Sequence, residues 1–293
     1  MEVNNPGLIK KGNNAQEIVR EINAEALRIG YDGKRAAKNL TGLGNYSRWL
    51  IEQLSREFPG NSYFVYTPKV KRAARIDQFF NLKNVFLKLP VVRSFLWRNI
   101  GILKDLNRDR IKLYHGLSHE LPSIIHHTNI RSVVTIHDLI FLRYPQHYKF
   151  FDRLIYKIKS RKACKNADKI IAISERTKAD IIEFYSVPED KIQVIYQSCD
   201  DSFKKPENEE RKNQIRTKYK LPEKYILYVG TIESRKNLVA LVSALSNVDK
   251  AYKLVVIGSK KNYFKKVNRI IQENDLTNRV MIFERMDFSD LPG

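Results

Sequence analysis

The sequence predicts an α/β protein built from two doubly wound, Rossmann-like parallel sheets, and three observations support this. Continuous apolar runs such as residues 133–136 and 169–173 are typical of strands buried on both faces. Helical segments separate these runs, as parallel sheets require. The alternation stops at a polar stretch after Tyr196 and then begins again, which indicates two similar halves.

Each element of the first half has its own sequence signal. Apolar runs bounded by turns predict strands at residues 27–31, 62–66, 111–114, 133–136, 169–173 and 193–196. Longer segments between them predict helices at residues 46–58, 148–164 and 176–185. Residues 1–26 are polar and are predicted to form an extension with one helical piece at residues 15–28.

The second half repeats the pattern on a smaller scale. Strands are predicted at residues 225–229, 253–257 and 280–283, and helices at residues 238–245 and 263–274. A nucleotide-binding half commonly has about five or six strands, so we expect this one to be incomplete. Ser289 and Asp290 have the character of helix N-cap residues, yet no helix follows them. The predicted organisation is an extension at residues 1–26, a first domain at 27–199, a linker at 200–222 and a partial, truncated second domain at 223–293.

Composition limits the cellular setting and the partners. The formal net charge of +21 attracts anions, which include nucleic acid, acidic lipid headgroups and phosphorylated substrates. The two cysteines, Cys164 and Cys199, are far apart, which suits a reducing compartment. The N-terminus has no apolar core for a signal peptide, and no run approaches the roughly 18 apolar residues of a membrane span. We expect a cytoplasmic protein, or one bound peripherally to the inner face of the membrane.

The first candidate site is the turn at residues 41–45, which precedes a predicted helix. Gly42 and Gly44 would let the backbone approach a ligand, with Asn45 beside them, and a helix N-terminus favours an anion. The pattern G-x-G-x-x-G is not met, because Ser47 stands at its last position. A tight strand-to-helix turn without a ligand would explain the same residues.

A second candidate is His137, which directly follows the apolar run 133–136 together with Asp138. Ligands of open α/β sheets bind at the carboxyl ends of strands. An imidazole there can donate a hydrogen bond to a substrate hydroxyl or act as a base. The alternative is an imidazole whose hydrogen bonds are satisfied by its neighbours.

The third candidate follows the predicted strand 225–229. Gly230 permits close approach of a ligand, and Arg235 and Lys236 stand directly before a predicted helix. Two fixed cations beside a helix N-terminus can hold a diphosphate. The alternative is a solvated pair of charges at a helix start.

The stretch 69–112 is basic and aromatic, with 12 Lys and Arg against three Asp. Its interleaved aromatic residues are Phe79, Phe80, Phe86, Phe95 and Trp97. This composition suits an anionic membrane surface, nucleic acid whose bases stack on aromatic rings, or two ordinary amphipathic helices with a solvated basic face. The histidines and cysteines fit no metal-binding spacing, so no metal cofactor is expected.

The candidate sites lie within longer motifs that occur in a fixed order. The strings are TGLGNY at residues 41–46, VTIHDL at 134–139, RYP at 143–145, ADKIIAISERTK at 167–178 and YVGTIESRKNL at 228–238. Together they resemble retaining glycosyltransferases of the GT-B type, the family-4 group, and the resemblance runs from about residue 28 to residue 292.

The resemblance implies metal-independent transfer of a sugar from a nucleotide sugar to a glycan or lipid-linked acceptor, with retention at the anomeric carbon. The reaction would serve polysaccharide or cell-surface glycan synthesis. The first domain would bind the acceptor and the second would bind the nucleotide sugar. By matching position, the expected donor-binding residues are Gly230, Glu233, Arg235 and Lys236. The residues expected at the acceptor or phosphate loop are Gly42, Gly44 and Asn45, and His137 is the expected catalytic residue, in contact with the transferred sugar.

Two other functions remain open at this point. In the family a later segment carries two glutamates that bind the donor, and this sequence ends before it. The alternative is therefore a catalytically inactive, truncated fragment that acts as a binding module. Nucleic-acid binding rests on charge alone, and we expect no such partner, because the basic residues form no recognition module. The motifs do not specify the sugar, the nucleotide base or the acceptor.

Overall fold

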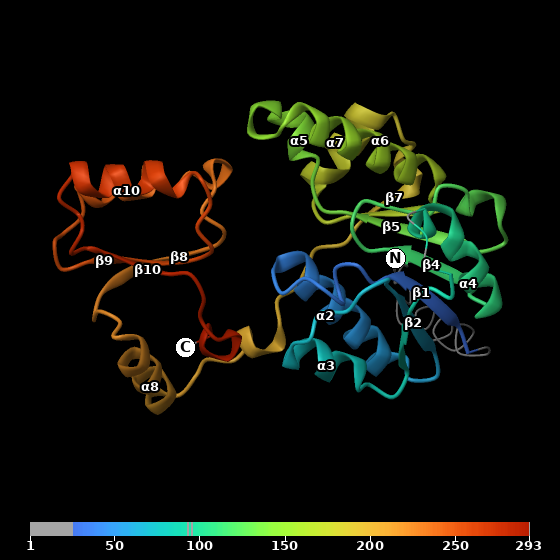
Figure 1. Ribbon diagram of the computed structural model, residues 1–293, viewed down its shortest axis with the longest axis horizontal. Coiled ribbons are helices and arrows are strands. Elements are labelled where there is room, and N and C mark those ends of the chain that lie inside the picture. The colour runs from blue at the N-terminus through green and yellow to red at the C-terminus, as the bar shows by residue number, and fades with distance from the viewer. Residues whose placement is uncertain (1–25, 93, 95, 293) are drawn as a thin grey trace, which may run out of the picture. The chain divides into compact units, whose positions relative to one another are not determined.

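The computed structural model describes residues 26–92, 94 and 96–292 (Figure 1). Residues 1–25, which make up almost all of the predicted N-terminal extension, lie outside the described part. The chain divides into two compact units, residues 1–198 and residues 199–293.

The N-terminal unit is built on a seven-stranded sheet in the order β3-β2-β1-β4-β5-β6-β7, and every pairing is parallel. The strands are β1 (Arg28–Asp32), β2 (Ser62–Tyr66), β3 (Val85–Lys88), β4 (Leu113–Gly116), β5 (Arg131–Ile136), β6 (Lys169–Ala172) and β7 (Ile192–Val194). The predicted doubly wound parallel sheet is therefore confirmed in this unit.

Helices connect successive strands of this sheet. They are α2 (Gly42–Glu57), α3 (Ala74–Phe80), α4 (Ile102–Arg108), α5 (Ile140–Arg143), α6 (Phe150–Asn166) and α7 (Glu175–Tyr185). A π-helical turn, Trp97–Gly101, precedes α4, and short 3₁₀ turns lie at Ile125–His127, Pro145–His147 and Glu189–Lys191. Ser174 is the N-cap of α7, because its side chain accepts a hydrogen bond from the Thr177 amide.

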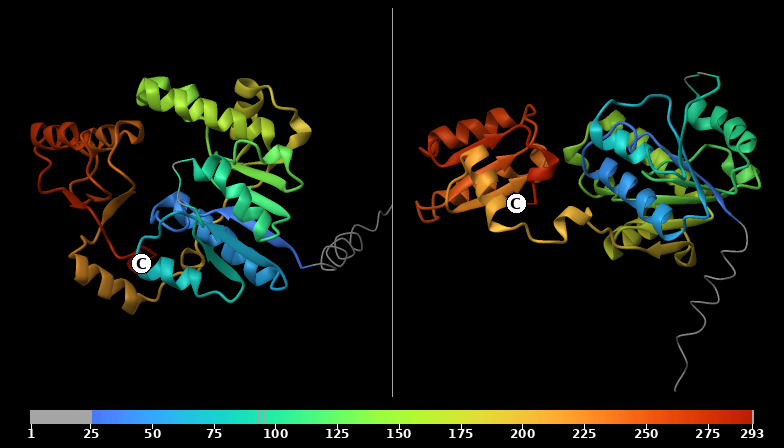
Figure 2. Two further views of the ribbon diagram at one scale, coloured as in Figure 1. Left: turned by 45° about the vertical axis from the view of Figure 1, so that its right-hand side comes forward. Right: turned by 90° about the horizontal axis from the view of Figure 1, so that it is seen from below.

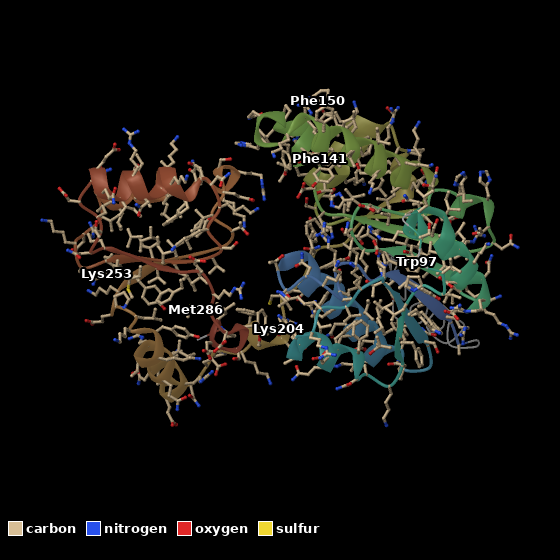
Figure 3. The ribbon with its side chains drawn as sticks, viewed as in Figure 1. Trp97, Phe141, Phe150, Lys204, Lys253 and Met286 are labelled. Carbon is tan, nitrogen blue, oxygen red and sulfur yellow. The ribbon has the colours of Figure 1, made fainter. Side chains whose placement is uncertain are left out.

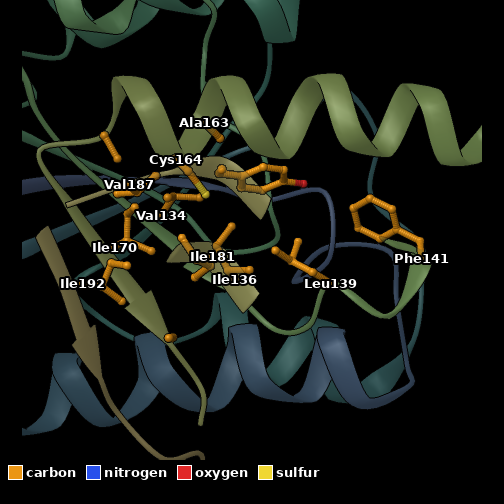
Figure 4. Close-up of a cluster of buried hydrophobic side chains, with 13 residues drawn as sticks. Val134, Ile136, Leu139, Phe141, Ala163, Cys164, Ile170, Ile181, Val187 and Ile192 are labelled. Carbon is orange, nitrogen blue, oxygen red and sulfur yellow. The ribbon is translucent and has the colours of Figure 1, made fainter. Parts of the chain in front are cut away.

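Two helical layers cover the sheet, with α2 and α3 on one face and α5 to α7 on the other (Figure 1). On the α2 side, Ile51 packs among Tyr31 and Val65. On the other side, the apolar side chains of β5 and β6 pack beneath α6, whose Cys164 is fully buried there (Figure 4). The burial of β5 and β6 explains why their sequences are continuous apolar runs.

The C-terminal unit has a three-stranded parallel sheet in the order β10-β9-β8. Its elements are α8 (Glu209–Tyr219), β8 (Tyr225–Val229), α9 (Leu238–Leu245), β9 (Lys253–Ile257), α10 (Phe264–Glu273) and β10 (Val280–Phe283), with 3₁₀ turns at Asp201–Phe203, Ser234–Lys236 and Phe288–Asp290. Helices α9 and α10 share a core with the sheet, which contains the buried Leu238, Val256 and Val267. Leu227 and Val229 of β8 are exposed.

The stretch predicted as a linker, residues 200–222, contains helix α8 and belongs to the C-terminal unit. Its sequence is so polar that no apolar periodicity marks it, and Ile215 is its one buried residue within the helix. The Asn208 side chain caps α8 by accepting from the Arg211 amide.

Asp290, whose residue type is that of a helix N-cap, is a buried carboxylate within a 3₁₀ turn. It pairs with Arg211, accepts from Lys218 Nζ at 2.7 Å and accepts from the Tyr219 hydroxyl at 2.8 Å. These bonds lower the pKa of Asp290, with the Lys218 hydrogen bond as the largest cause and burial opposing it. The residue therefore ties the end of the described chain to α8.

Helix α2 begins at Gly42, earlier than predicted, so both glycines of the candidate turn belong to its first turn. A Cβ atom on Gly44 would lie 1.8 Å from the Asn39 carbonyl oxygen, whereas a Cβ atom on Gly42 would meet no atom within 4 Å. Packing of α2 against residues 36–39 therefore requires glycine at position 44 and not at position 42.

We predict that Gly44→Ala lowers the free energy of unfolding by about 1–3 kcal/mol or more, because the new methyl group overlaps main-chain atoms. Gly42→Ala is the matched control, and we expect it to change stability by less than about 0.5 kcal/mol. Chemical denaturation followed by circular dichroism measures both. Equal stability of the two variants would contradict the packing argument.

Candidate functional site

The loops after β1, β4 and β5 surround a pocket of about 150 Å³ in the N-terminal unit. The order of strands reverses between β1 and β4, which is where open α/β sheets bind ligands. The polar residues that line the pocket are Arg35, Ser118, His119, Glu120, Asp138 and Lys159. Phe141, Tyr148 and Tyr156 form an apolar wall beside them.

Ion pairs fix the charge of this pocket. Arg98 pairs with Asp32 at 2.5 Å and with Glu120 at 3.3 Å, and Lys159 lies 3.4 Å from Glu120. Burial alone would raise the pKa of Glu120, but Arg98 and Lys159 outweigh burial, so the pKa is lowered. Glu120 is therefore ionised at neutral pH, and it accepts hydrogen bonds instead of donating a proton.

The glycine turn borders the pocket through Leu43. The Asn45 side chain, expected in a phosphate loop, accepts from Arg48 at 2.8 Å and from Arg75 at 3.2 Å. Arg48 is buried and also donates to the carbonyl oxygens of Ala36 and Asn39. Asn45 and Arg48 thus hold the turn in shape, whereas Gly42 leaves the start of α2 open for a ligand.

His137 follows β5 and is buried, with both ring nitrogens bonded inside the chain. Its Nε2 lies 2.9 Å from the Leu117 carbonyl oxygen, which can only accept, so Nε2 carries the proton. Its Nδ1 lies 2.8 Å from the Gln197 amide nitrogen and accepts from it. Burial lowers the pKa of His137, so the ring is neutral at pH 7. A substrate hydroxyl can reach Nδ1 only by replacing the exposed Gln197 amide.

His119 is the imidazole that lines the pocket. Its ring stacks on His137 with the centroids 5.5 Å apart, and its Nε2 accepts from the His137 main-chain amide at 3.3 Å. Burial lowers the pKa of His119, with the charges of His137 and Arg35 adding to the effect. The neutral ring therefore carries its proton on Nδ1, where it can donate to a hydroxyl.

A third imidazole, His115 of β4, lies in the interior of the sheet. Its Nε2 lies 2.8 Å from the Thr135 hydroxyl, which also bonds the Tyr46 hydroxyl at 3.1 Å. Tyr46 in turn meets His137 edge-on, with ring centroids 4.9 Å apart. Burial lowers the pKa of His115 to about 3. This network links the glycine turn to the residues after β4 and β5.

In the C-terminal unit, the expected donor residues gather where β8 ends. Gly230 has φ +154°, and a Cβ atom built on it would lie 2.6 Å from Lys236 Nζ. The Lys236 ammonium group is thus folded back over the main chain at the carboxyl end of β8. Gly258, at the end of the neighbouring β9, also packs against Gly230, because a Cβ atom there would lie 1.8 Å from the Gly230 oxygen.

Glu233 holds two further cations of this cluster. It accepts from Arg235 at 2.6 Å and from Lys261 at 3.4 Å. Arg235 and Lys236 are both exposed at this strand end, ahead of α9. The arrangement can bind an anion through Lys236, with Arg235 shared between that anion and Glu233.

Of the three alternatives for the basic stretch 69–112, the structure favours ordinary packing helices over an aromatic binding surface. Phe79 and Trp97 are buried in the core, and the Trp97 indole donates to Asp105 at 2.7 Å. Phe86 is exposed, whereas Phe95 lies outside the described residues. The interleaved aromatic residues therefore serve mainly to pack α3 and α4 onto the sheet.

Among the described residues no group of three or more His, Cys, Asp or Glu side chains could hold a metal ion. In the same part of the chain, no helix is long and apolar enough to cross a bilayer.

Comparison with known proteins identifies the family. The model of Glycosyltransferase Family 4 matches residues 40–203, which is more than half of the chain. The chain belongs to Glycosyltransferase Family 4. A second model, Glycosyl transferases group 1, matches residues 209–292 of this family 4 chain.

Among curated proteins, O-antigen chain mannosyltransferase B of Escherichia coli is 29% identical over 222 residues, which covers 70% of this chain and 56% of the relative. O-antigen chain mannosyltransferase RfbU of Salmonella typhimurium is 25% identical over 182 residues, or 61% of this chain and 46% of the relative. The family 4 chain thus spans about half the length of these relatives.

Solved structures confirm the predicted GT-B fold class. Anabaena Alr3699/HepE in complex with UDP-glucose matches with a TM-score of 0.67 at 14% identity, covering 91% of this chain and 71% of that one. WaaG, a glycosyltransferase involved in lipopolysaccharide biosynthesis, matches with a TM-score of 0.60 at 16% identity, covering 90% and 72%. At these identities the likeness concerns the fold.

Sequence reasoning missed most residues of the N-terminal site, including Arg35, Ser118 and Glu120. His119 and Lys159 line the pocket, and Gln197 bonds His137 from a position 60 residues along the chain. The position of His119 could have identified it as a site residue, because it lies a few residues after Gly116, where the strand ends. Gln197 and Lys159 carried no such signal, because their role depends on how distant segments pack.

We predict that Gln197→Ala raises the pKa of His137 by about one pH unit, because the lost N–H donor stabilised the neutral ring and water then reaches Nδ1. Nuclear magnetic resonance titration of the imidazole measures the change. Gln193→Ala, an exposed glutamine on β7, is the matched control. An unchanged pKa of His137 in the Gln197 variant would show that the bond does not hold the ring in solution.

We also predict that the free energy of unfolding falls as the pH drops from about 6.5 towards 3. The folded pKa of His115, about 3, lies below its ordinary value of 6.5, so its contribution is complete above pH 6.5 and is lost during acidification. His115→Gln should flatten this pH dependence, whereas His147→Gln, at an exposed position, should not. The same slope in all three proteins would exclude His115 as a cause.

Proposed function

We propose that this family 4 chain transfers a sugar from a nucleotide sugar to a hydroxyl group of a glycan or lipid-linked acceptor, with retention, in polysaccharide synthesis. The O-antigen mannosyltransferases among its relatives support the pathway class and a hexose as the transferred sugar. The observation that carries the proposal is the Lys236 ammonium group folded over Gly230 at the end of β8.

The donor diphosphate is proposed to bind at this strand end. Gly230 allows the diphosphate to approach the main chain, and Lys236 and Arg235 offset its charge. Solved neighbours with UDP or UDP-glucose bound share the fold, which supports a nucleotide sugar as the ligand class. Glu233 keeps Arg235 in place until the diphosphate competes for it.

In the proposed reaction the bond between the anomeric carbon and the diphosphate oxygen breaks. The acceptor oxygen forms the new bond on the same face, and the acceptor proton passes to the departing diphosphate oxygen. Negative charge grows on the diphosphate as it leaves, so fixed cations stabilise the transition state more than the ground state. No metal ion is proposed, because Arg235 and Lys236 supply the positive charge.

The acceptor is proposed to occupy the pocket of the N-terminal unit. His119 Nδ1 can donate to an acceptor hydroxyl, and the carboxyl oxygens of Glu120 and Asp138 can accept from one. His137 supports this pocket by fixing His119 through its main-chain amide. A direct contact of His137 with the transferred sugar requires the Gln197 amide to move away from Nδ1.

We further propose a cytoplasmic location with peripheral contact to an anionic membrane, and no nucleic-acid partner. The formal net charge of +21 supports attraction to an anionic surface.

Calorimetric titration of UDP and GDP into the purified chain tests the donor site. We expect Lys236→Ala to weaken nucleotide binding about tenfold or more. We expect Arg235→Ala to weaken it less, because Arg235 also pairs with Glu233. Lys250→Ala removes an exposed charge ahead of β9, at the opposite end of the sheet, and should leave affinity unchanged.

If Arg235 and Lys236 supply the positive charge without a metal ion, EDTA should leave the affinities for UDP and GDP unchanged. No binding of either nucleotide by the wild type, or equal affinity of the Lys236 and Lys250 variants, would refute a diphosphate site at this position. Transfer of a radiolabelled sugar to a lipid-linked oligosaccharide by the same preparation tests the reaction itself.

A further inference from the structure

Helix α6 exposes an apolar face that the proposed chemistry does not use. Phe150 and Phe151 are 61% and 76% exposed, and Leu154, Ile155 and Ile158 are exposed with them. At 100° per residue these five side chains share one side of the helix. The opposite side, with Ser160, Ala163 and Cys164, is buried on the sheet (Figure 4). A contiguous exposed apolar stripe marks a surface for another partner.

The same outward side becomes basic in the second half of α6. Arg161, Lys162 and Lys165 follow the apolar residues along it, and all three are exposed. Helix α6 carries one acidic residue, Asp152, against six Lys and Arg. An apolar half followed by a cationic half is the composition of helices that lie in the interface of anionic bilayers.

A hollow beside this face adds a second feature that suits lipid. It measures about 320 Å³ and is lined by Leu142, Pro145, Phe150, Arg153, Leu154 and Lys157. Its apolar lining fits part of a hydrocarbon chain, and Arg153 and Lys157 are cations suited to the phosphate of that lipid. Phe150, labelled in Figure 3, is the first residue of α6.

We propose that the outward face of α6 docks this chain onto an anionic phospholipid bilayer, with the five apolar side chains in the acyl boundary and the cations at the headgroups. A membrane surface is one of the three alternatives that the sequence leaves open for residues 69–112, whereas the structure assigns this contact to α6. The choice of lipid follows from charge, because the face carries an excess of cations that a neutral apolar partner would leave unpaired.

The proposed docking also bears on the acceptor, and this part rests on the proposed function. Tyr156 and Lys159 of α6 line the pocket that contains His119 and Asp138. At 100° per residue Tyr156 and Lys159 lie outside the apolar stripe, so a helix lying in the interface sets this pocket about one helix diameter, roughly 10 Å, from the headgroups. A lipid-linked acceptor whose phosphate remains at the membrane surface can then present its sugar without leaving the bilayer.

Vesicle flotation with the full 293-residue chain tests the proposal. We expect binding to vesicles that contain phosphatidylglycerol and none to vesicles of phosphatidylcholine alone. Phe151→Ser/Ile155→Ser should reduce binding about tenfold or more. Arg161→Gln/Lys162→Gln should reduce it about fivefold for each charge and weaken its salt dependence.

Three controls keep the result specific. Lys265→Gln/Lys266→Gln on α10 removes the same charge and should bind as the wild type does. Val91→Ser/Val92→Ser changes two exposed residues of the stretch 69–112 and should also bind normally. Circular dichroism and nucleotide titration of every variant verify that the fold and the donor site are intact, so failure of docking is separated from failure of the proposed function.

Several outcomes would overturn the proposal. They are no binding of the wild type to anionic vesicles, full binding of both α6 variants, or loss of binding in the Val91/Val92 variant alone. If the chain self-associates without lipid and the α6 substitutions abolish that self-association, the face instead binds a second copy of the chain.

Discussion

Parallel pairing of every strand is the constraint from which the candidate sites follow. It places the carboxyl ends of β1, β4 and β5 at one edge, so that segments far apart in sequence meet there. The same rule acts in the C-terminal unit, where pairing of β8 with β9 brings Gly258 against Gly230. Each site is therefore assembled from short loops on a rigid sheet, and its precision comes from the strand register.

The N-terminal site combines a dry interior with a charged rim. Three imidazoles, His115, His119 and His137, are kept neutral by burial, and each has a hydrogen-bond partner inside the unit. A cation among them would meet a low dielectric, and this burial outweighs the opposing charge of Asp138 on His137, which explains the direction of their pKa changes. The fixed charges lie at the rim instead, in the pairs of Arg98 and Lys159 with Glu120. This separation suits recognition of hydroxyl groups, because neutral donors and ionised acceptors lie side by side.

Much of the fold was predictable, because buried parallel strands have continuous apolar sequences and each expected strand of the first half was found. The polar helix α8 was not, since a helix with one buried residue leaves no periodic signal. For the sites, the structure places the expected loops at strand ends, but the sequence did not show what each side chain does. Gly44 serves packing, Asn45 holds arginines and His137 lies behind His119. Such roles depend on contacts across the sheet, which a single sequence does not display.

The small sheet of the C-terminal unit has a consequence for handling the protein. Among the described strands, β8 and β10 each pair with β9 alone, and β8 also presents Leu227 and Val229 to solvent. Unpaired main-chain groups beside exposed branched side chains form a template onto which a strand of another molecule can add. For a sample of these 293 residues, strand addition at β8 is therefore the expected route of association as concentration rises. The high positive net charge makes neighbouring molecules repel each other and opposes this association at low salt. Ions screen the repulsion, so added salt is expected to shorten the time for which concentrated samples can be stored.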